Sequence, residues 1–511
     1  MTSWPASTSR SHRCEPRKPA PPVTRMRLSM SRSSGGRGQG HSTRTQRPAA
    51  GPSIPENRFN IRHFAAACGP CLGRDNGPMT LATHEPVSLR ARWVVPIDRP
   101  PIAGGVVTVA GGRILAVEPR PAGRPIQDLG DVALLPGLVN AHTHLEFSRL
   151  DQPLGTAGAG FADWIRGVIA WRRASATAGL PSSDREGKWS RPTTSTDTAP
   201  RASAFASGLA ESRASGVAAL GEIATSDWQP QLAPGDPTVV IFRELLGLSP
   251  ERVGPNLALA AAHVARCRAT SLRGGLSPHA PYTVHPRLLE GACRLSAEAR
   301  VPLAMHLAES REELELLAVH RGPLVELLES LGAWHPDVLP AGRRALDYLR
   351  ALAQAHRALV IHGNYLAADE IEFLAARREQ MALVYCPRTH AYFGHAPYPL
   401  VQMLSCGVRV AIGTDSRASN PDLSLWHELV HIAARQTDVA PAEILRLGTL
   451  AGAEALGLAD TMGSLTPGKQ ATLVTVPLAG NVQDVHAALL HSDAVPRPLE
   501  RDLPAPRGGT S

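Results

Sequence analysis

The spacing of apolar and polar residues changes several times along the chain, and these changes predict where its strands and helices lie. Between residues 133 and 415, short runs rich in Val, Ile, Leu and Ala alternate with longer Ala/Leu/Glu/Arg segments of helical period. This alternation is typical of an α/β protein built from repeated β-strand and α-helix units. Eight runs have the length and composition of strands: 133–145, 216–222, 238–244, 274–279, 301–306, 358–362, 381–386 and 409–415. Eight parallel strands close into a barrel, so we predict a (β/α)₈ TIM-like barrel.

The two ends of this pattern have a different character. Residues 87–118 and 463–478 cluster β-branched residues around turn residues, which favours short strands. We expect both chain ends to contribute to one small β-structure, with the barrel inserted between them. In chain order, we predict a first β part at 86–134, the barrel at 135–455, a second β part at 456–490 and a loose Pro/Arg-rich end at 491–511. Two loops, 175–204 and 333–345, interrupt the barrel pattern.

Residues 1–85 are rich in Arg, Ser, Pro and Gly and should be disordered. Alternatively, Met79 is the true start of the protein, or the segment is a basic interaction arm that would bind nucleic acid in a salt-dependent way. The net charge is +8, but residues 1–78 hold 13 Lys and Arg against 3 Asp and Glu, and the remainder holds 40 against 42. Because the body is nearly neutral and lacks a basic stripe, we expect it to bind no nucleic acid.

The seven cysteines show no spacing of a disulfide framework, which favours a reducing, cytoplasmic location. Cys68 and Cys71 form a lone C-x-x-C pair, whereas a structural zinc site needs four ligands. No run of 18 apolar residues predicts a membrane span, and the N-terminus does not read as a signal peptide. We therefore expect no membrane partner.

Candidate chemistry lies at the ends of the predicted strands, where a barrel carries its active site. His142 and His144 end the first strand, and residues at i and i+2 of a strand point to the same face. Two imidazoles placed in this way can share one metal ion, although an isolated H-x-H can equally consist of surface or core histidines. His306 ends the fifth strand, and Glu309 follows it by three residues. Asp415 follows the eighth strand, where a carboxylate could also cap the next helix.

Taken together, four of these side chains offer three nitrogens and one oxygen: His142, His144, His306 and Asp415. This set leaves one position for water, which is the pattern of a catalytic rather than a structural metal site. Such an ion lowers the pKa of its bound water to about 7. We therefore predict one divalent ion, with zinc favoured over iron.

The motifs that carry these residues are LLPGLVNAHTHLEF, SPHAPYTV, MHLAES, VIHGNYL, YCPRTHAYFGH and VAIGTDSRASNPDLSLWHEL. They resemble the amidohydrolase superfamily. More narrowly, they resemble its aminohydrolase branch, which includes cytosine deaminase, adenosylhomocysteine/methylthioadenosine deaminases, aminodeoxyfutalosine deaminases and triazine hydrolases. The resemblance covers about residues 87–480. It implies a barrel with a small β-sandwich built from the N- and C-terminal segments.

The resemblance also implies roles for single residues. One zinc or iron would be held by the four ligands named above. Glu309 would shuttle a proton to the substrate ring nitrogen and the leaving group, and His362 would orient or deprotonate the metal-bound water, with Asp415 assisting. His279 would contact the substrate. It stands where binuclear branches carry a carboxylated lysine, which supports a single metal ion.

Three further stretches, 144–148, 161–165 and 242–247, are similar to aminodeoxyfutalosine deaminases and imply substrate contacts by Glu146 and Trp164. Arg388, with His390 and His395, could bind an anionic group such as a benzoate carboxylate, or Arg388 and His390 could be solvated loop residues. The implied reaction is hydrolytic deamination of an adenine-type nucleoside of the aminodeoxyfutalosine, adenosylhomocysteine or methylthioadenosine class. In this reaction, metal-bound hydroxide would attack the amine-bearing ring carbon.

Two other functions stay open at this point. The protein could hydrolyse another C–N or C–Cl bond, in a guanine, pyrimidine, triazine or hydantoin-like substrate, because a fold does not determine its substrate. It could also be a non-catalytic binding relative. The expected partner is a small-molecule substrate. Barrels of this kind are often dimers or larger, so a homo-oligomer is a further alternative.

Overall fold

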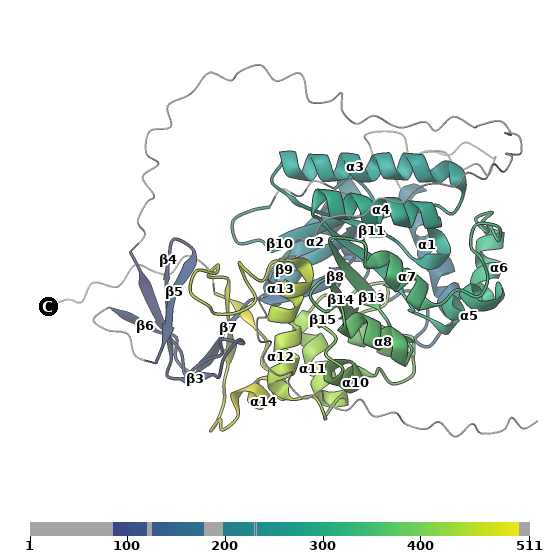
Figure 1. Cartoon of the computed structure of the whole chain (residues 1–511). Helices are drawn as coiled ribbons and strands as arrows, with labels where there is room; N and C mark the ends of the chain where they lie inside the picture. The colour runs from purple at the N-terminus through teal and green to yellow at the C-terminus, as the bar shows by residue number, and fades with distance from the viewer. Residues whose placement is uncertain (1–84, 120–124, 178–197, 229, 231, 500–511) are drawn as a thin grey trace, which may run out of the picture. The chain divides into compact units, whose positions relative to one another are not determined.

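The computed structural model describes residues 85–119, 125–177, 198–228, 230 and 232–499 (Figure 1). Eight parallel strands form one sheet in the order β8-β9-β10-β11-β12-β13-β14-β15. A bridge between Thr143 and Asp415 brings the last strand to the first, so the sheet closes into the predicted barrel. The strands are β8 (Leu138–Thr143), β9 (Val217–Ala224), β10 (Thr238–Leu245), β11 (Arg273–Pro278), β12 (Pro302–Leu307), β13 (Arg357–His362), β14 (Met381–Tyr385) and β15 (Val410–Ile412).

Each of the eight predicted strands corresponds to a barrel strand, but the first was predicted too long. Residues 133–145 divide into β7 (Val132–Pro136), which belongs to another sheet, and β8. Gly137 separates the two strands, and a Cβ atom placed there would lie 2.5 Å from the Cβ of Ala218. A side chain does not fit at this crossing. An apolar run shows where strands lie but cannot show that its two halves enter different sheets.

Helices and short 3₁₀ turns (η) connect the barrel strands and cover the barrel (Figure 1). They are α1 (Phe161–Thr177), α2 (Thr198–Ala214), α3 (Val253–Ala269), α4 (Pro286–Ala299), α5 (Arg311–Val319), α6 (Pro323–Ser330), α7 (Ala345–Leu352), α8 (Ala368–Ala375), α9 (Pro387–Tyr392), α10 (Leu400–Ser405), α11 (Leu425–Arg435), α12 (Pro441–Leu447), α13 (Leu450–Leu456), η2 (Leu145–Phe147), η3 (Pro250–Arg252) and η4 (Pro281–Thr283). Side chains of α13, including Leu456, join Val139, Ala219 and Phe242 in the core inside the barrel. The barrel is therefore a packed core rather than a pore.

The remaining strands form two sheets that share a core including Leu89, Leu134 and Leu473. One sheet has the order β5-β4-β1-β6, with β1 (Val87–Arg90), β4 (Val106–Ala110), β5 (Arg113–Glu118) and β6 (Ile126–Asp128). The other has the order β17-β16-β7-β2-β3, with β2 (Trp93–Val94), β3 (Ile102–Ala103), β7, β16 (Leu473–Pro477) and β17 (Arg497–Pro498). Gly111 and Gly112 have φ of 55° and 73°, as a tight hairpin between β4 and β5 requires.

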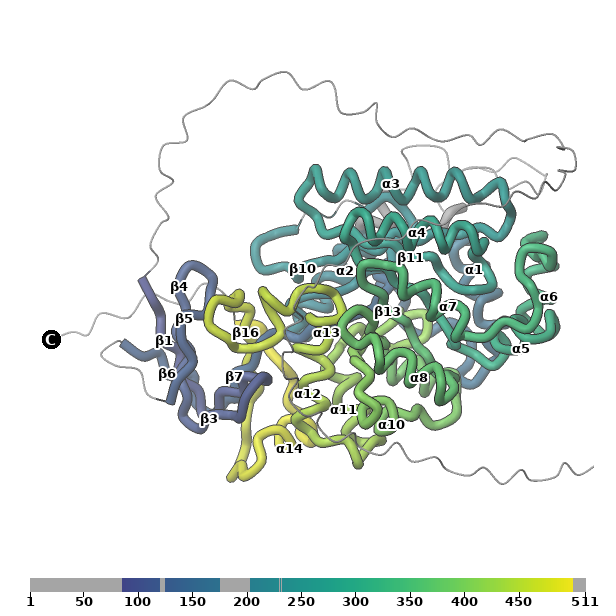
Figure 2. Tube along the Cα trace, in the orientation of Figure 1, coloured from purple at the N-terminus to yellow at the C-terminus, as the bar shows by residue number. Residues whose placement is uncertain are grey.

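Strands from both chain ends pair in the second sheet, as predicted for the sandwich. β7 and β16 are antiparallel neighbours, and Figure 2 shows the C-terminal strand β16 beside the N-terminal strand β7. Beyond it lie α14 (Val485–Leu490) and β17, and β17 pairs with β16. The indole Nε1 of Trp426 also donates to the carbonyl of Ala494. The C-terminal end was predicted to be loose, but β pairing orders part of it, up to residue 499. A Pro/Arg-rich composition does not reveal this pairing.

Several predictions fall on residues outside the described ranges. These are residues 1–84, which include Cys68 and Cys71, residues 178–197 and residues 500–511. Within the predicted loop at 175–204, α1 extends to Thr177 and α2 begins at Thr198; the loop at 333–345 lies between α6 and α7. Among the helices described, none combines the length and apolar character needed to cross a bilayer.

Candidate active site

A cluster of histidines and one aspartate lies at the carboxyl ends of the barrel strands. His142 lies in β8, and His144 comes directly after this strand. His306 lies in β12, His362 is the last residue of β13, and Asp415 follows β15. All five side chains are buried. The ring of His142 is 4.8 Å from that of His144, 5.0 Å from that of His306 and 5.8 Å from that of His362. The fold thus brings together residues that are up to 273 positions apart in the sequence.

The backbone turns sharply at three of the strand ends that form this cluster. Ala308, His362 and Asp415 have φ of 53°, 68° and 57°, in the left-handed region that non-glycine residues rarely adopt. Each such residue costs about 1–3 kcal/mol, and these conformations concentrate at functional sites. Ile361 faces the barrel interior, so a fully extended His362 would face outward. The left-handed turn lets its ring approach His142 instead.

The ligand atoms have the spacing that one metal ion requires. The Nε2 atoms of His142 and His144 each lie 3.6 Å from Oδ1 of Asp415. Tetrahedral zinc ligands at about 2.0–2.1 Å from the ion would be about 3.3–3.5 Å apart. His142 also groups with His306 and His362, and within each group the candidate ligand atoms all lie within 4.8 Å. Two overlapping groups could therefore hold an ion, one formed by His142, His144 and Asp415 and the other by His142, His306 and His362.

Unsatisfied nitrogen atoms support the same interpretation. Both ring nitrogens of His142, Nδ1 of His144 and Nε2 of His362 are buried without a hydrogen-bond partner in the described part of the chain. Buried polar atoms are otherwise almost always paired. In contrast, Nδ1 of His306 lies 3.1 Å from the carbonyl of His279, to which it can donate, and this leaves Nε2 free to bind a metal.

The electrostatic environment favours the protonation states that bind a cation. Burial, with the neighbouring histidines, lowers the pKa of His144, His306 and His362. Burial alone would raise the pKa of Asp415, but the adjacent imidazole rings, that of His142 first, hold it below its usual value. Ser419 Oγ also donates to Oδ2 of Asp415 at 3.3 Å. Neutral imidazoles and an ionised carboxylate are the forms that bind a divalent metal.

Glu309 lies beside His362, with 3.3 Å between Glu309 Oε1 and His362 Nε2. Burial raises the pKa of Glu309, and the nearby carboxylates of Asp415 and Glu313 raise it further. A carboxyl group with a raised pKa can hold and release a proton near neutral pH. Asn364 Nδ2 donates to the backbone carbonyl of Glu309 at 2.8 Å, which ties this segment to the loop after β13.

Two buried carboxylates that were not predicted from the sequence hold the backbone of this site. Glu313 accepts from the amides of Ala308 and Glu309, both at 2.9 Å. Glu222 accepts from the amide of Leu145, directly after His144, at 3.1 and 2.9 Å. The first had a local signal, because Ser310 and Glu313 have the S-x-x-E spacing of a helix capping box. The second links residues far apart in the sequence and had none.

His279 follows β11, and its ring centroid is 5.1 Å from that of His306. Its Nδ1 lies 2.8 Å from Thr283 Oγ1. Burial lowers the pKa of His279 to about 3, with the charge of Arg172 contributing. A neutral imidazole therefore lies beside the cluster, where the sequence predicts a substrate contact.

Glu146 and Trp164, the other predicted substrate contacts, already have partners within the protein. Glu146 accepts from Arg172 Nη2 and, at 3.1 Å, from Thr225 Oγ1. The indole of Trp164 donates to the carbonyl of Ala418 at 3.0 Å, in the loop that follows Asp415. Both residues therefore contact the loops around the cluster, and their contact with a substrate stays a prediction.

The structure counts against the predicted anion-binding role of Arg388. Its guanidinium forms a bidentate pair with Asp422 at 2.7 and 3.0 Å, and its backbone amide donates to Glu428. This pairing satisfies the positive charge, so Arg388 serves the loop rather than a ligand. His390 is buried rather than solvated, and its Nε2 has no partner in the described region.

The pair between Arg388 and Asp422 predicts a pH-dependent contribution to stability. Asp422→Asn should lower the free energy of unfolding at pH 7 by about 1.5–3 kcal/mol, since it removes hydrogen bonds between charged groups. Burial raises the pKa of Asp422, but hydrogen bonds from His427 and Arg388 outweigh it and lower the pKa overall. The stabilisation is therefore present above the unfolded-state pKa near 4 and is lost as the pH falls through the lower folded-state pKa. Urea unfolding at a series of pH values from 7 to 3 would measure the difference.

A matched control for this experiment is Asp163→Asn, which removes an exposed ion pair with Arg166. Exposed pairs contribute about 0–1 kcal/mol, so this change should be small at every pH. A difference between wild type and Asp422→Asn that stays constant from pH 7 to pH 3 would contradict the assignment.

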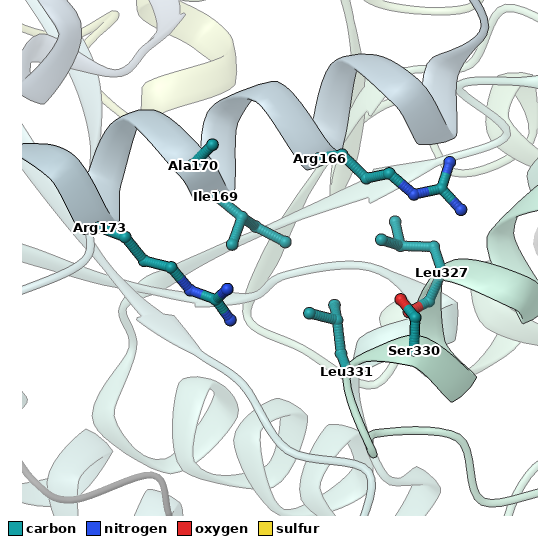
Figure 3. A pocket seen from close by; sticks show the side chains of 7 residues that line it. All are labelled: Arg166, Ile169, Ala170, Arg173, Leu327, Ser330 and Leu331. Carbon is teal, nitrogen blue, oxygen red and sulfur yellow. The ribbon is translucent and has the colours of Figure 1, made fainter. Parts of the chain in front are cut away.

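A surface hollow of about 390 Å³ lies between α1 and α6. Figure 3 shows the residues that line it: Arg166, Ile169, Ala170, Arg173, Leu327, Ser330 and Leu331. None of them is a predicted ligand or catalytic residue. The candidate active site is therefore the histidine and aspartate cluster at the end of the barrel.

Comparison with known proteins agrees with this location. The model of the Amidohydrolase family matches residues 133–493, a range that contains every barrel strand and the whole cluster. The chain belongs to the amidohydrolase family. This membership confirms the predicted superfamily and the predicted enzyme class, a hydrolase that acts on carbon–nitrogen bonds.

Two relatives and one solved structure show which kinds of protein the chain is similar to. A 5-methylthioadenosine/S-adenosylhomocysteine deaminase from Moorella thermoacetica is 29% identical over 411 residues, which cover 75% of this chain and 84% of that protein. An aminodeoxyfutalosine deaminase from Deinococcus radiodurans is 29% identical over 383 residues, 69% of this chain and 81% of that one. The solved structure of an adenosine deaminase from Xanthomonas campestris with bound zinc has a TM-score of 0.58 at 24% identity, covering 80% of this chain and 89% of that one. This last similarity shows the shared fold.

Proposed function

We propose that this amidohydrolase hydrolytically deaminates an adenine-type nucleoside of the methylthioadenosine, adenosylhomocysteine or aminodeoxyfutalosine class, with one divalent metal ion. The observation that carries the proposal is the convergence of the buried rings of His142 and His144 on Asp415, with both nitrogens of His142 unpaired among the described residues, and with Glu309 beside His362. The names of the two similar deaminases support the substrate class.

The ion would be held by His142, His144, His306 and Asp415. When bound, such an ion lowers the pKa of a coordinated water to about 7 and so makes a nucleophile available at neutral pH. Three nitrogens and a carboxylate oxygen suit zinc and iron. We favour zinc, which is bound in the solved Xanthomonas campestris deaminase.

In the proposed reaction, water adds to the amine-bearing ring carbon, the bond from this carbon to the amine breaks, and ammonia leaves. Glu309 would hold a proton at Oε1 and donate it to the adjacent ring nitrogen, while His362, through Nε2, would orient the attacking water and accept one of its protons, with Asp415 assisting. The Glu309 carboxylate would then take the proton of the newly added hydroxyl group and deliver it to the leaving amine. The water oxygen stays in the product as a ring carbonyl, and return of the proton from His362 to Glu309, 3.3 Å away, restores the starting state, so atoms and charge balance.

Other side chains would select and orient the substrate. We propose that His279 contacts the purine ring and that Glu146 and Trp164 line the approach to it, while Arg388 is left out because of its pairing with Asp422. The expected partner is a small nucleoside. Cytoplasmic location and assembly into a homo-oligomer stay predictions.

An ammonia-release assay over a panel of substrates tests the proposal. The metal-loaded protein should release ammonia from methylthioadenosine, adenosylhomocysteine or aminodeoxyfutalosine at a higher kcat/KM than from guanine, cytosine or a triazine. Release from only the latter group would replace the proposed substrate class with another of the same reaction type. No release from any compound by protein with a full metal complement would favour a non-catalytic binding role.

A further inference from the structure

The carboxylate of Asp415 divides its two oxygens between the histidine cluster and a pair of buried hydroxyl groups. Oδ1 lies 3.6 Å from Nε2 of His142 and of His144, whereas Oδ2 accepts from Ser419 Oγ at 3.3 Å. A second hydroxyl lies behind the first, because Thr389 Oγ1 is 3.0 Å from Ser419 Oγ. These side chains therefore form a chain of hydrogen bonds that leads from the cluster to α9.

Only one direction of donation satisfies every member of this chain. A metal-binding carboxylate is ionised and can only accept hydrogen bonds, so the hydroxyl proton of Ser419 points at Asp415. The Ser419 oxygen is then free to accept, and the Thr389 hydroxyl donates to it. Ser419 and Thr389 are 0% and 1% exposed, so bulk water does not compete for either hydroxyl.

The backbone of Asp415 is fixed independently of this chain. Its amide donates to the carbonyl of His142 at 3.1 Å, and its carbonyl accepts from Thr143 Oγ1 at 3.0 Å. These bonds leave the carboxylate free to rotate about its side-chain bonds. The hydrogen bond from Ser419 restrains this rotation, and it does so at Oδ2, which leaves Oδ1 for the side of the imidazoles.

The buried carboxylate of Glu428 explains why the two hydroxyls meet. Glu428 lies on α11 and is 0% exposed. Its oxygens accept from Nδ2 of Asn420 at 2.6 Å and from the backbone amide of Arg388 at 2.9 Å. These two donors are the chain neighbours of Ser419 and Thr389. One carboxylate thus holds the loop after β15 against the start of α9, and the two hydroxyls come together as a result.

We propose that Ser419, backed by Thr389, is a positioning residue that keeps Oδ2 of Asp415 occupied and so presents Oδ1 alone to the metal ion. This inference rests on the proposed function, because it assumes that an ion binds at the cluster. A carboxylate with both oxygens free can bind one ion through both of them. The second oxygen would then take the position that a catalytic site leaves open for water. The hydroxyl chain would keep this position open.

Zinc affinity, measured on the metal-free full chain by competition with a chromophoric chelator, tests this role without any turnover. Ser419→Ala should weaken zinc binding by about 10–100-fold, the usual effect of removing a group that holds a metal ligand. Thr389→Val, which nearly keeps the shape of the side chain, should weaken binding less, because Ser419 can still donate to Asp415. Thr389→Ser keeps the hydroxyl and should bind zinc as tightly as the wild type.

Co²⁺ bound in place of zinc reports on the geometry of the site. The visible absorption of bound Co²⁺ weakens as its coordination number rises, so binding of a second Asp415 oxygen would be detected. Ser419→Ala should show this weaker absorption at full Co²⁺ occupancy, whereas the wild type and Thr389→Ser should share one spectrum. A purely structural role of Ser419 would lower the stability of the variant but leave the spectrum of the loaded protein unchanged.

Ser88→Ala is the matched control. Ser88 and Thr108 form another buried pair of hydroxyls at 3.0 Å, between β1 and β4. Removing this hydroxyl should leave zinc affinity and the Co²⁺ spectrum unchanged. An equal loss of zinc affinity in Ser88→Ala and Ser419→Ala would overturn the positioning role and assign the loss to general destabilisation.

The same measurements separate this inference from the proposed function. Wild-type affinity and an unchanged spectrum in Ser419→Ala, in a protein that binds one zinc ion, would overturn the positioning role alone. A wild type that binds no zinc would overturn both this role and the metal-dependent reaction. If Ser419→Ala does not fold, the comparison of Thr389→Val with Thr389→Ser decides the question, and equal zinc affinities in those two variants would overturn the role of the hydroxyl chain.

Discussion

Glu309→Gln is expected to lower kcat for the best adenine nucleoside by about 10²–10⁴-fold, the usual contribution of one acid–base group. The amide has nearly the shape of the carboxyl group but cannot deliver a proton to the ring nitrogen. Because Glu309 lies beside His362 rather than in the predicted ligand set, the metal content should be unchanged. Steady-state kinetics and metal analysis of the same preparation measure both quantities.

Glu315→Gln is a suitable control for this variant. Glu315 lies on α5, six residues beyond Glu309, and is exposed. Its replacement should change neither kcat nor metal content. An unchanged kcat in Glu309→Gln would remove the proposed role, and a loss of metal in that variant would indicate that Glu309 is a ligand.

Removal of the metal ion is expected to have the largest effect of all. Chelation should lower kcat/KM by more than about 10³-fold. A bound ion of this kind lowers the reaction barrier by several kcal/mol, and each 1.4 kcal/mol changes the rate about tenfold. It should also lower the melting temperature, since an ion that binds only the folded state at 1,000 times its Kd contributes about 4 kcal/mol. Adding zinc back should restore activity and stability together.

His306→Asn tests the assignment of the ligands themselves. It removes one predicted nitrogen ligand and should reduce the metal content and the activity in parallel. His491→Asn, at an exposed position after α14, should leave both unchanged. Full activity in chelator-treated protein that is shown to be free of metal would contradict the proposed chemistry.

The positions of the strands and of the main candidate ligands followed from local pattern. Runs of apolar residues of strand length, separated by helical segments, predicted eight barrel strands, and each exists. His142, His306 and Asp415 lie at the ends of such runs, and parallel strands bring their carboxyl ends to the same side of a barrel. These predictions needed only the spacing of apolar residues and the rule that parallel barrel strands end on the same side. They did not depend on knowing which strands are neighbours.

The tertiary structure decided whatever depends on register and on pairing between distant residues. It divided the run at 133–145 between two sheets at Gly137, and it paired Arg388 with Asp422 instead of leaving its charge for a ligand. It also brought Thr389 within hydrogen-bond distance of Ser419, next to Asp415. The chain by itself determined which residue types stand at strand ends, because periodicity is a local property. Packing across the whole barrel decides which buried charges meet a partner. The sequence cannot show this, because a carboxylate with a partner and one without are the same residue in the sequence.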